Sequence, residues 1–299
     1  MIDVIIPTYN AHKYLDRCLL SLNMQTIKDL IKIYIINDGS DFNYDSIVNK
    51  FNKKLDIKEI DLKDNKGPGN ARNMGLDVSS SEYVFFMDSD DELVNSISLE
   101  LLLNNIKDND LCIGGVVVED ENNNQIYTDN YKNTLHGKLF KRKFLMDNKL
   151  QFNDSYRSED NSFYNLVMLL EPTICYINKP IYYYKYNDSS LTDVDKDVFI
   201  DSYNYNVSWV IESSIKRNIS DSKIAKYLYK SFIYNYFLYN NYDRDFKELI
   251  NSFKKYNLKY FTKYFDMISE DEKLEIINEY KIDSTSYISI DDFYNLLVK

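Results

Sequence analysis

The chain has 299 residues, of which 44% are hydrophobic and 28% charged, and its formal net charge is −11. This length allows one large or two modest domains, and only 7 glycines and 4 prolines argue against long flexible linkers. Because binding to nucleic acid phosphates requires clustered lysine and arginine, the acidic balance disfavours a nucleic acid partner.

The three cysteines, Cys18, Cys112 and Cys175, lie far apart among apolar residues. Their spacing is not that of a metal or redox site, so we expect reduced thiols in the core of a cytoplasmic protein. The chain starts with an apolar strand-like segment, and no apolar run approaches the ~20 residues of a membrane span. We therefore expect a chain that is neither exported nor embedded in a membrane.

The first 106 residues alternate between short apolar runs and helical patterns. Strands are expected at residues 2–6, 31–36, 57–62 and 83–87. Helices are expected from an N-cap at Asn10 to about residue 25, over residues 47–51, after the turn 64–69, and over residues 97–106. This alternation predicts an α/β fold with a mostly parallel sheet and helices on both faces.

Three of these strands end in polar segments: Thr8-Tyr9-Asn10, Asn37-Asp38-Gly39 and Asp88-Ser89-Asp90. In a parallel sheet these three ends lie on the same edge, where open α/β sheets bind ligands. The convergence predicts a single site at that edge.

The strand 83–87 is followed at once by Asp88, Asp90, Asp91 and Glu92. Such a cluster is costly because like charges repel and partial burial disfavours them. A divalent cation would offset the cost, and oxygen ligands favour Mg²⁺ or Mn²⁺ over Zn²⁺. The alternative is an acidic N-terminus of the following helix.

Four motifs then occur in order: Pro7-Thr8-Tyr9-Asn10, Asn37-Asp38-Gly39-Ser40, Gly67-x-Gly69-x-Ala71-Arg72-Asn73-x-Gly75 and Asp88-Ser89-Asp90-Asp91. Together they resemble the nucleotide-sugar half of family 2 glycosyltransferases, which have the GT-A fold. The resemblance covers residues 1–192. It implies a nucleotide-sugar half (1–110) and an acceptor half (111–192). Over residues 193–299, beyond the resemblance, the spacing of apolar residues predicts a helical region.

The resemblance also implies a role for each donor-site residue. Tyr9 would stack on a uracil ring, Asp38 would accept a hydrogen bond from the ring N–H, and Arg72 would donate to the base. Asp88 would hold the ribose, and Asp90 would ligate the Mn²⁺ or Mg²⁺ that bridges the diphosphate. The remaining expected donor-site residues are Pro7, Asn10, Asn65, Gly67 and Ser89. The alternatives are a surface aromatic residue for Tyr9, a surface ion pair for Arg72 and an ordinary turn residue for Asp38.

Residues 110–118 predict a further strand and residues 119–130 a polar turn region. Lys138 then opens a segment similar to one in the family, and we expect it to contact the acceptor. Relatives often have Trp-Asn before this lysine, where this chain has His136-Gly137. His136 has no partner at metal-ligand spacing, so we expect a structural or solvated histidine.

Residues 157–163 form the second motif with chemical potential. Ser158 is the expected N-cap of a helix to about residue 170, and Asp160 matches the Glu-Asp motif of the family. The resemblance implies that Asp160 is the general base of an inverting displacement and that Glu159 holds acceptor hydroxyls. The alternative is a capped helix whose acids complement its dipole.

Strand pieces are expected at residues 173–177 and 181–186, broken by Asn178-Lys179-Pro180. The segment 182–192 resembles the closing motif of the family, but Lys185 and Asn187 stand where many relatives have arginine and histidine. This difference implies weaker metal affinity or dependence.

The remaining chain predicts helices at 201–216, at 221–239, after a Ser269-Glu272 capping box, and after Ser289. The helix 221–239 is rich in tyrosine and phenylalanine. We expect these rings to pack on the catalytic domain. Acceptor binding, self-association and contact with a membrane surface are the alternatives.

These inferences predict an inverting glycosyltransferase with a UDP-linked donor and a glycan, glycolipid or protein acceptor, acting in bacterial surface glycan synthesis. It would be cytoplasmic, with a peripheral position at the inner membrane face left open. A sugar nucleotidyltransferase is disfavoured, because residues 7–10 lack the glycine-rich, arginine-containing loop of those enzymes. The non-enzymatic alternative is a catalytically inactive module that binds only a nucleotide or a partner.

Overall fold

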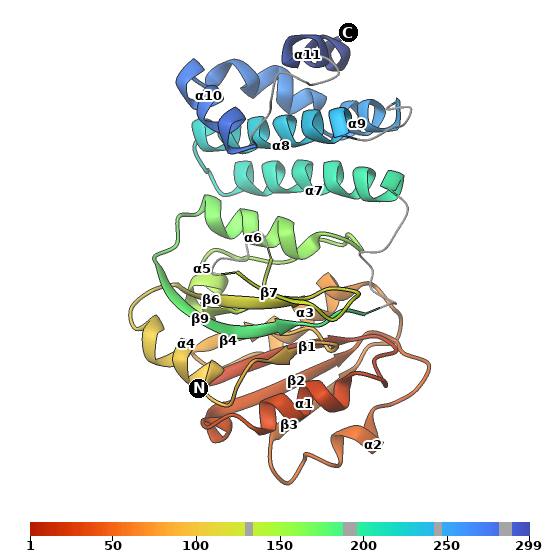
Figure 1. The fold of residues 1–299 in the computed structure, drawn as a ribbon, viewed down its shortest axis with the longest axis vertical. Coiled ribbons are helices and arrows are strands. Elements are labelled where there is room, and N and C mark those ends of the chain that lie inside the picture. Colours follow the sequence, from red (N-terminus) through yellow and green to blue (C-terminus); the bar gives the residue numbers. More distant parts are fainter. Residues whose placement is uncertain (129–133, 188–195, 242–246, 281–288) are drawn as a thin grey trace. The chain divides into compact units, whose positions relative to one another are not determined.

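The computed structural model describes residues 1–128, 134–187, 196–241, 247–280 and 289–299. Two compact units divide the chain, Met1–Asp193 and Val194–Lys299 (Figure 1). Each unit has its own cluster of buried apolar side chains. The domain boundary expected at residue 192 lies outside the described residues.

One mixed sheet organises the first unit, with the strand order β3-β2-β1-β4-β8-β6-β9-β5 and β7 paired to β6. The strands are β1 Ile2–Thr8, β2 Ile31–Asn37, β3 Asp56–Asp61, β4 Tyr83–Phe86, β5 Glu92–Leu93, β6 Leu111–Glu119, β7 Gln125–Thr128, β8 Lys138–Lys141 and β9 Ile174–Tyr184. Strands β1 to β4 are parallel, whereas β8 runs antiparallel to both β4 and β6. The predicted fold class, a mostly parallel sheet flanked by helices and followed by a helical region, is confirmed.

Helices cover both faces of this sheet (Figure 1). They are α1 Leu15–Asn23, α2 Asp45–Val48, α3 Pro68–Val78, α4 Ser98–Ile106, α5 Arg142–Asp147 and α6 Glu159–Leu169. Alternate strand residues such as Val4 and Ile6 join α1, α2 and α4 in one apolar cluster. Ile5 points to the other face, where its side chain packs so closely on Gly75 of α3 that no larger residue fits there. Successive residues of a strand therefore pack against two separate layers of helices, one on each face of the sheet.

Strands β1, β2 and β4 run in the same direction, so their carboxyl ends lie at the same edge of the sheet. The polar ends that follow them at Tyr9, Asp38 and Asp88 therefore gather at that edge, as the sequence predicts. After β4 the chain forms the short strand β5, and α4 begins only at Ser98. The acids 88–92 thus are not the N-terminus of a helix.

Two predicted helix caps are wrong. Helix α1 begins at Leu15, and Asn10 lies outside it with φ 51°, where its backbone N–H donates to Ser40 Oγ at 3.0 Å. Ser158 does precede α6, but its φ is 57° and its side chain makes no capping hydrogen bond. An N-cap side chain reaches the helix N–H groups from the extended region of backbone space, and neither residue adopts it.

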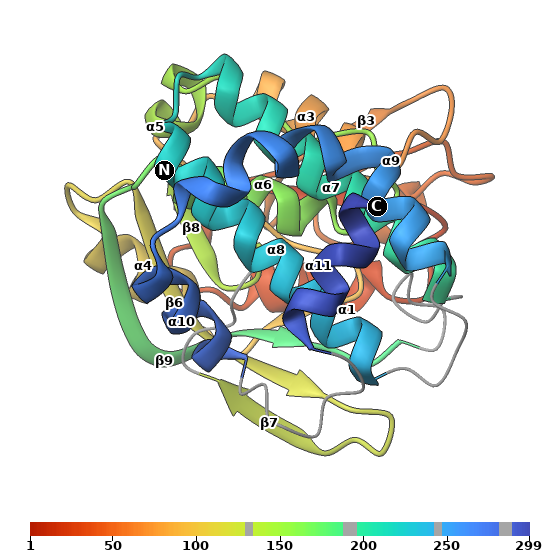
Figure 2. The same ribbon diagram turned by 90° about the horizontal axis from the view of Figure 1, so that it is seen from above.

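Two strand predictions also needed tertiary context. The polar segment 119–130 contains β7, which continues β6 as an antiparallel hairpin (Figure 2). The two pieces expected around Asn178-Lys179-Pro180 are one strand, β9. Its register against β6 shifts at Gly114 and Gly115, so the extra residues are accommodated as an irregularity rather than as a break.

The second unit contains α7 Lys196–Lys216, α8 Asp221–Asn241, α9 Lys247–Tyr264, α10 Glu270–Glu279 and α11 Ile290–Val298. The capping box at Ser269 and Glu272 and the cap at Ser289 are confirmed, whereas α9 was not predicted. Phe232 of α8 packs on Phe261 of α9 and on Phe293 of α11. Helices α8, α9 and α11 are labelled in Figure 2. The aromatic residues of α8 thus build the core of this unit. Within the described residues, every helix is too short or too polar to cross a membrane.

Candidate active site

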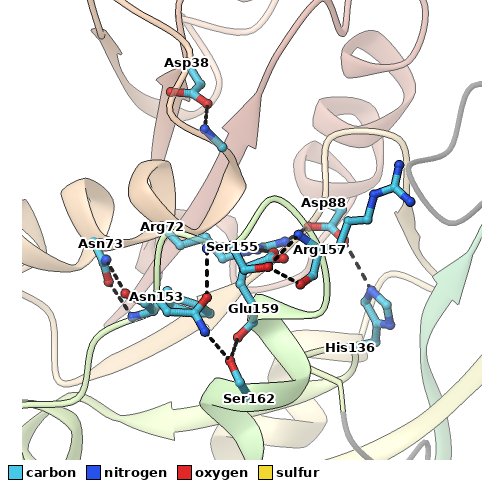
Figure 3. A network of polar contacts seen from close by, with 12 residues as sticks. Asp38, Arg72, Asn73, Asp88, His136, Asn153, Ser155, Arg157, Glu159 and Ser162 are labelled. Atoms are coloured by element: carbon cyan, nitrogen blue, oxygen red, sulfur yellow. Dashed lines mark hydrogen bonds and ion pairs between the residues drawn. The ribbon is translucent and has the colours of Figure 1, made fainter. Parts of the chain in front are cut away.

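Arg72 of α3 lies between two carboxylates from different parts of the first unit (Figure 3). Its guanidinium is 2.6 Å from Asp88 Oδ1, after β4, and also donates to Glu159 Oε1 at the start of α6. The side chains of Arg72 and Glu159 are both only 5% exposed. One buried cation therefore joins α3 and the end of β4 to the helix that carries Asp160.

This arrangement shifts the pKa values of all three groups. Burial alone would lower the pKa of Arg72, but the charges of Asp88, Glu159 and Asp160 raise it above its usual value. Burial alone would raise the pKa of Asp88, yet Arg72 and His136 hold it well below its usual range. For Glu159, burial outweighs the opposing charge of Arg72 and raises the pKa to about 7.

The acids after Asp88 are held by the end of β9. Asp91 accepts hydrogen bonds from the Tyr182 hydroxyl at 2.7 Å and from the Lys185 backbone N–H at 2.9 Å. Asp90 Oδ2 accepts one from the Asn187 side chain at 2.8 Å. Burial raises the pKa of Asp90 and of Asp91, and the charges of the neighbouring acids add to the shift.

His136 joins this acidic loop, which sequence reasoning did not anticipate. Its Nε2 lies 3.3 Å from Asp88 Oδ2 (Figure 3). The same atom is 3.9 Å from Asp91 Oδ2. Strand β8, which begins two residues later, pairs with β4 and so brings His136 beside the end of that strand. In the sequence, the only indication of a role for His136 is its position two residues before Lys138. The contact of His136 with Asp88 follows only from the pairing of β8 with β4.

The donor atoms of this loop fit a divalent cation. One ligand atom each from Asp88, Asp91 and His136 lies within 4.8 Å of the others, whereas Asp90, the ligand predicted from the sequence, is not among these three and binds the Asn187 side chain. The raised pKa values of Asp90 and Asp91 indicate an excess of buried negative charge, which a divalent cation would relieve. Carboxylate oxygens suit Mg²⁺ and Mn²⁺, and imidazole suits transition-metal ions, so this set of ligand atoms is compatible with Mn²⁺.

Asp38 lies at a second position along the same sheet edge. Its Oδ1 accepts a hydrogen bond from Lys66 N at 3.0 Å and its Oδ2 one from Gly67 N at 2.8 Å. Gly67 directly precedes α3 and has φ 90°, a conformation that favours glycine. The side-chain oxygen of Asn65 accepts a hydrogen bond from the same Gly67 N–H at 3.0 Å. The structure thus brings Asp38, Asn65 and Gly67 together.

The other expected donor-site residues surround these two positions. Pro7 is buried within β1 and pairs with Ile36 of β2. Tyr9, directly after β1, is 52% exposed. Asn10 Oδ1 accepts from Asp41 N at 3.4 Å, and Ser89 is half-buried on the acidic loop.

The expected acceptor-side residues differ in accessibility. Asp160 is half-buried in the first turn of α6, and burial raises its pKa against the opposing charges of Arg72 and His136. Lys138 is fully buried, with its ammonium 4.7 Å from the Tyr164 ring centre, and burial lowers its pKa to about 7. Direct contact between Lys138 and an acceptor would therefore require the surrounding side chains to move.

Comparison with known proteins places this site in context. The family model for glycosyl transferase family 2 matches residues 3–170. Glycosyltransferase GlyG of Streptococcus pneumoniae is 27% identical over 258 residues, which are 75% of this chain and 81% of GlyG. The poly(ribitol-phosphate) beta-N-acetylglucosaminyltransferase TarP of Staphylococcus aureus is 31% identical over 192 residues, which are 56% of this chain and 57% of TarP.

Two solved structures resemble the fold. S. aureus TarS 1-349 in complex with UDP-GlcNAc has a TM-score of 0.71 at 20% identity, over 94% of this chain and 91% of that one. The mannosyltransferase PcManGT from Pyrobaculum calidifontis, in complex with GDP-Man and Mn²⁺, has a TM-score of 0.52 at 12% identity, over 98% and 78%. At these identities the likeness establishes the fold, which includes the helical second unit in the case of TarS.

Proposed function

Because the chain belongs to glycosyl transferase family 2, we propose that it transfers a sugar from a UDP-linked donor to an acceptor hydroxyl with inversion at the anomeric carbon. The observation that carries this proposal is the buried contact of Arg72 with both Asp88 and Glu159. It couples the predicted donor site to the helix that bears the predicted base. A capped surface helix would not need such a contact.

On the donor side, we assign recognition of the uracil to Tyr9 and Asp38 and of the ribose to Asp88. Both Asp38 oxygens accept hydrogen bonds from backbone N–H groups, which fix the orientation of this buried carboxylate. Asp90, with Asp88, Asp91 and His136, would hold Mn²⁺ or Mg²⁺. When bound, the ion supplies Lewis acidity that neutralises the departing diphosphate.

On the acceptor side, we assign the general base to Asp160. Its carboxylate would take the proton of the acceptor hydroxyl as that oxygen bonds to the anomeric carbon and the bond to the diphosphate breaks. Glu159 is already bound to Arg72, so we assign it to the support of this arrangement. TarP and TarS act on poly(ribitol-phosphate) by their names, which supports a bacterial surface glycan as the acceptor class.

A catalytically inactive module remains the second candidate, because Asn187 replaces the histidine of many relatives and binds Asp90 directly. The test is release of UDP from a panel of UDP-sugars with Mn²⁺ and then with excess chelator. Release from one sugar that chelator abolishes supports the transferase. Tight UDP binding without release, even with candidate acceptors, would support the inactive module.

The substitution Asp90→Asn is expected to weaken Mn²⁺-dependent UDP binding by roughly 10- to 100-fold or more, because it removes a ligand charge from the acidic loop. Isothermal titration of UDP with and without Mn²⁺ measures the effect. Asp147→Asn, which changes an exposed acid paired with Lys143, serves as the control. Wild-type affinity for UDP and Mn²⁺ in Asp90→Asn would remove Asp90 from the metal site.

The substitution His136→Phe is expected to weaken Mn²⁺ binding by roughly 10- to 100-fold, since it keeps a ring against Tyr182 and Tyr184 but removes the imidazole nitrogen. Electron paramagnetic resonance of free Mn²⁺ measures the affinity without any turnover. The chain has one other histidine, the exposed His12, and His12→Phe is the matched control. Equal Mn²⁺ affinity in the two variants would show that His136 is not a ligand.

A further inference from the structure

The loop between β8–α5 and helix α6 is fastened to the donor half of the first unit. The Asn73 side chain of α3 both accepts from Phe152 N at 2.8 Å and donates to Phe152 O at 2.9 Å. A methyl group on Gly69 would lie 2.5 Å from Asn153 O, so the loop passes directly over the start of α3. Residues 152–158 therefore belong spatially to the edge that carries Asp38.

Tyr156 is the exposed aromatic residue of this loop. A methyl group on Gly67 would lie 3.2 Å from Cδ1 of the Tyr156 ring, and the Tyr156 hydroxyl is 3.4 Å from Asn65 O. Tyr156 is nevertheless 55% exposed. Tyr156 is thus held against the glycine turn with a large part of its surface facing solvent.

Two contacts relate Tyr156 to Tyr9. The N–H of Gly67, the glycine against which the Tyr156 ring lies, donates to Asp38 Oδ2 at 2.8 Å. The Asp38 backbone N–H donates to Thr8 O at 2.8 Å. Tyr9 is the residue that follows Thr8 in the chain. Tyr156 therefore lies against the glycine turn whose Gly67 N–H binds the Asp38 carboxylate, and Tyr9 follows the strand residue that binds the Asp38 backbone.

We propose that Tyr156 forms an aromatic wall of the nucleobase site, beside the Asp38 carboxylate that would accept the ring N–H. This inference rests on the proposed function and adds a donor-binding residue from the acceptor half. A flat base stacked on Tyr156 would cover the exposed ring, and such stacking changes affinity by roughly 5- to 150-fold when the aromatic residue is replaced by alanine. Because Asp160 follows on the same segment, an occupied donor site would also hold the predicted base in place.

The test measures UDP binding by isothermal titration of the full chain with Mn²⁺. Tyr156→Ala is expected to bind UDP at least about 5-fold more weakly, whereas Tyr156→Phe, which keeps the ring, is expected to bind within about 2-fold of the wild type. Tyr176→Ala is the matched control, since Tyr176 is 61% exposed on β9. Inorganic pyrophosphate has no base. Its affinity for the protein with Mn²⁺ and without UDP should therefore be the same for Tyr156→Ala and the wild type.

Each other outcome is decisive. Equal UDP affinity in Tyr156→Ala and Tyr176→Ala would overturn the inference and leave the proposed function standing. An equal loss in Tyr156→Phe and Tyr156→Ala would show that the hydroxyl contact with Asn65 matters, and a parallel loss of pyrophosphate binding would show a purely structural role; both overturn the aromatic wall. A wild-type protein that binds neither UDP, GDP nor dTDP would overturn the inference together with the proposed function.

Discussion

Replacement of Asp160 by asparagine is expected to lower kcat for sugar transfer by about 10²-fold or more while UDP affinity stays unchanged. Asparagine has nearly the same shape but cannot take the proton of the acceptor hydroxyl. Asp160 is half-buried in the first turn of α6, and the partners of the Arg72 guanidinium are Asp88 and Glu159. The donor site should therefore remain intact in this variant.

The pH dependence of the wild type gives a second readout for Asp160. Burial raises its pKa above the usual range of aspartate, and the ionised base is lost as the pH falls through this raised pKa. The acidic limb of kcat should accordingly lie at higher pH than for a solvated aspartate. Asp154→Asn, an exposed acid on the same loop, is the control, and near-normal transfer by Asp160→Asn would exclude Asp160 as the base.

Replacement of Arg72 by methionine is expected to lower the free energy of unfolding by about 3–5 kcal/mol. Methionine fills much of the same volume but leaves Asp88 and the buried Glu159 without their shared cation. An uncompensated buried carboxylate is costly even when the pair itself adds little net stability. Equilibrium urea unfolding of the full chain measures the difference.

Two variants sharpen this measurement. Lys143→Met removes an ion pair with Asp147 whose members are 75% and 58% exposed, so it should change stability by less than ~1 kcal/mol. Arg72→Met with Glu159→Gln removes one of the two orphaned carboxylates and should recover part of the loss. A single Arg72→Met variant as stable as Lys143→Met would show that Arg72 is not the centre of a buried ionic cluster.

The local patterns that were predicted correctly share one property. The apolar runs of β1, β2 and β4 and the capping box at Ser269 depend on residues within a few positions of each other. Polar residues directly after parallel strands also need only the strand direction to be placed at a common edge. The convergence of Tyr9, Asp38 and Asp88 follows from these two facts.

The predictions that failed depend on contacts between distant segments. Asn10 and Ser158 have side chains suited to helix capping, but their positive φ angles are set by the loops in which they lie. Strand β9 crosses Asn178-Lys179-Pro180 without a break because β6 offers a shifted register at its two glycines. His136 has no partner at metal-ligand spacing in the sequence, and its neighbours Asp88 and Asp91 lie in the loop after β4, the strand that pairs with β8.

By itself the sequence determined the fold class, the family resemblance and the edge of the sheet at which the polar strand ends gather. These depend on hydrophobic periodicity and on the order of motifs, both of which are local or one-dimensional. Only the tertiary structure decided that Arg72 is shared between Asp88 and Glu159, that His136 joins the acidic loop, that Lys138 is buried and that Tyr156 lies against Gly67. Burial, charge pairing and side-chain contact arise when segments far apart in the chain pack together, so no local pattern contains them.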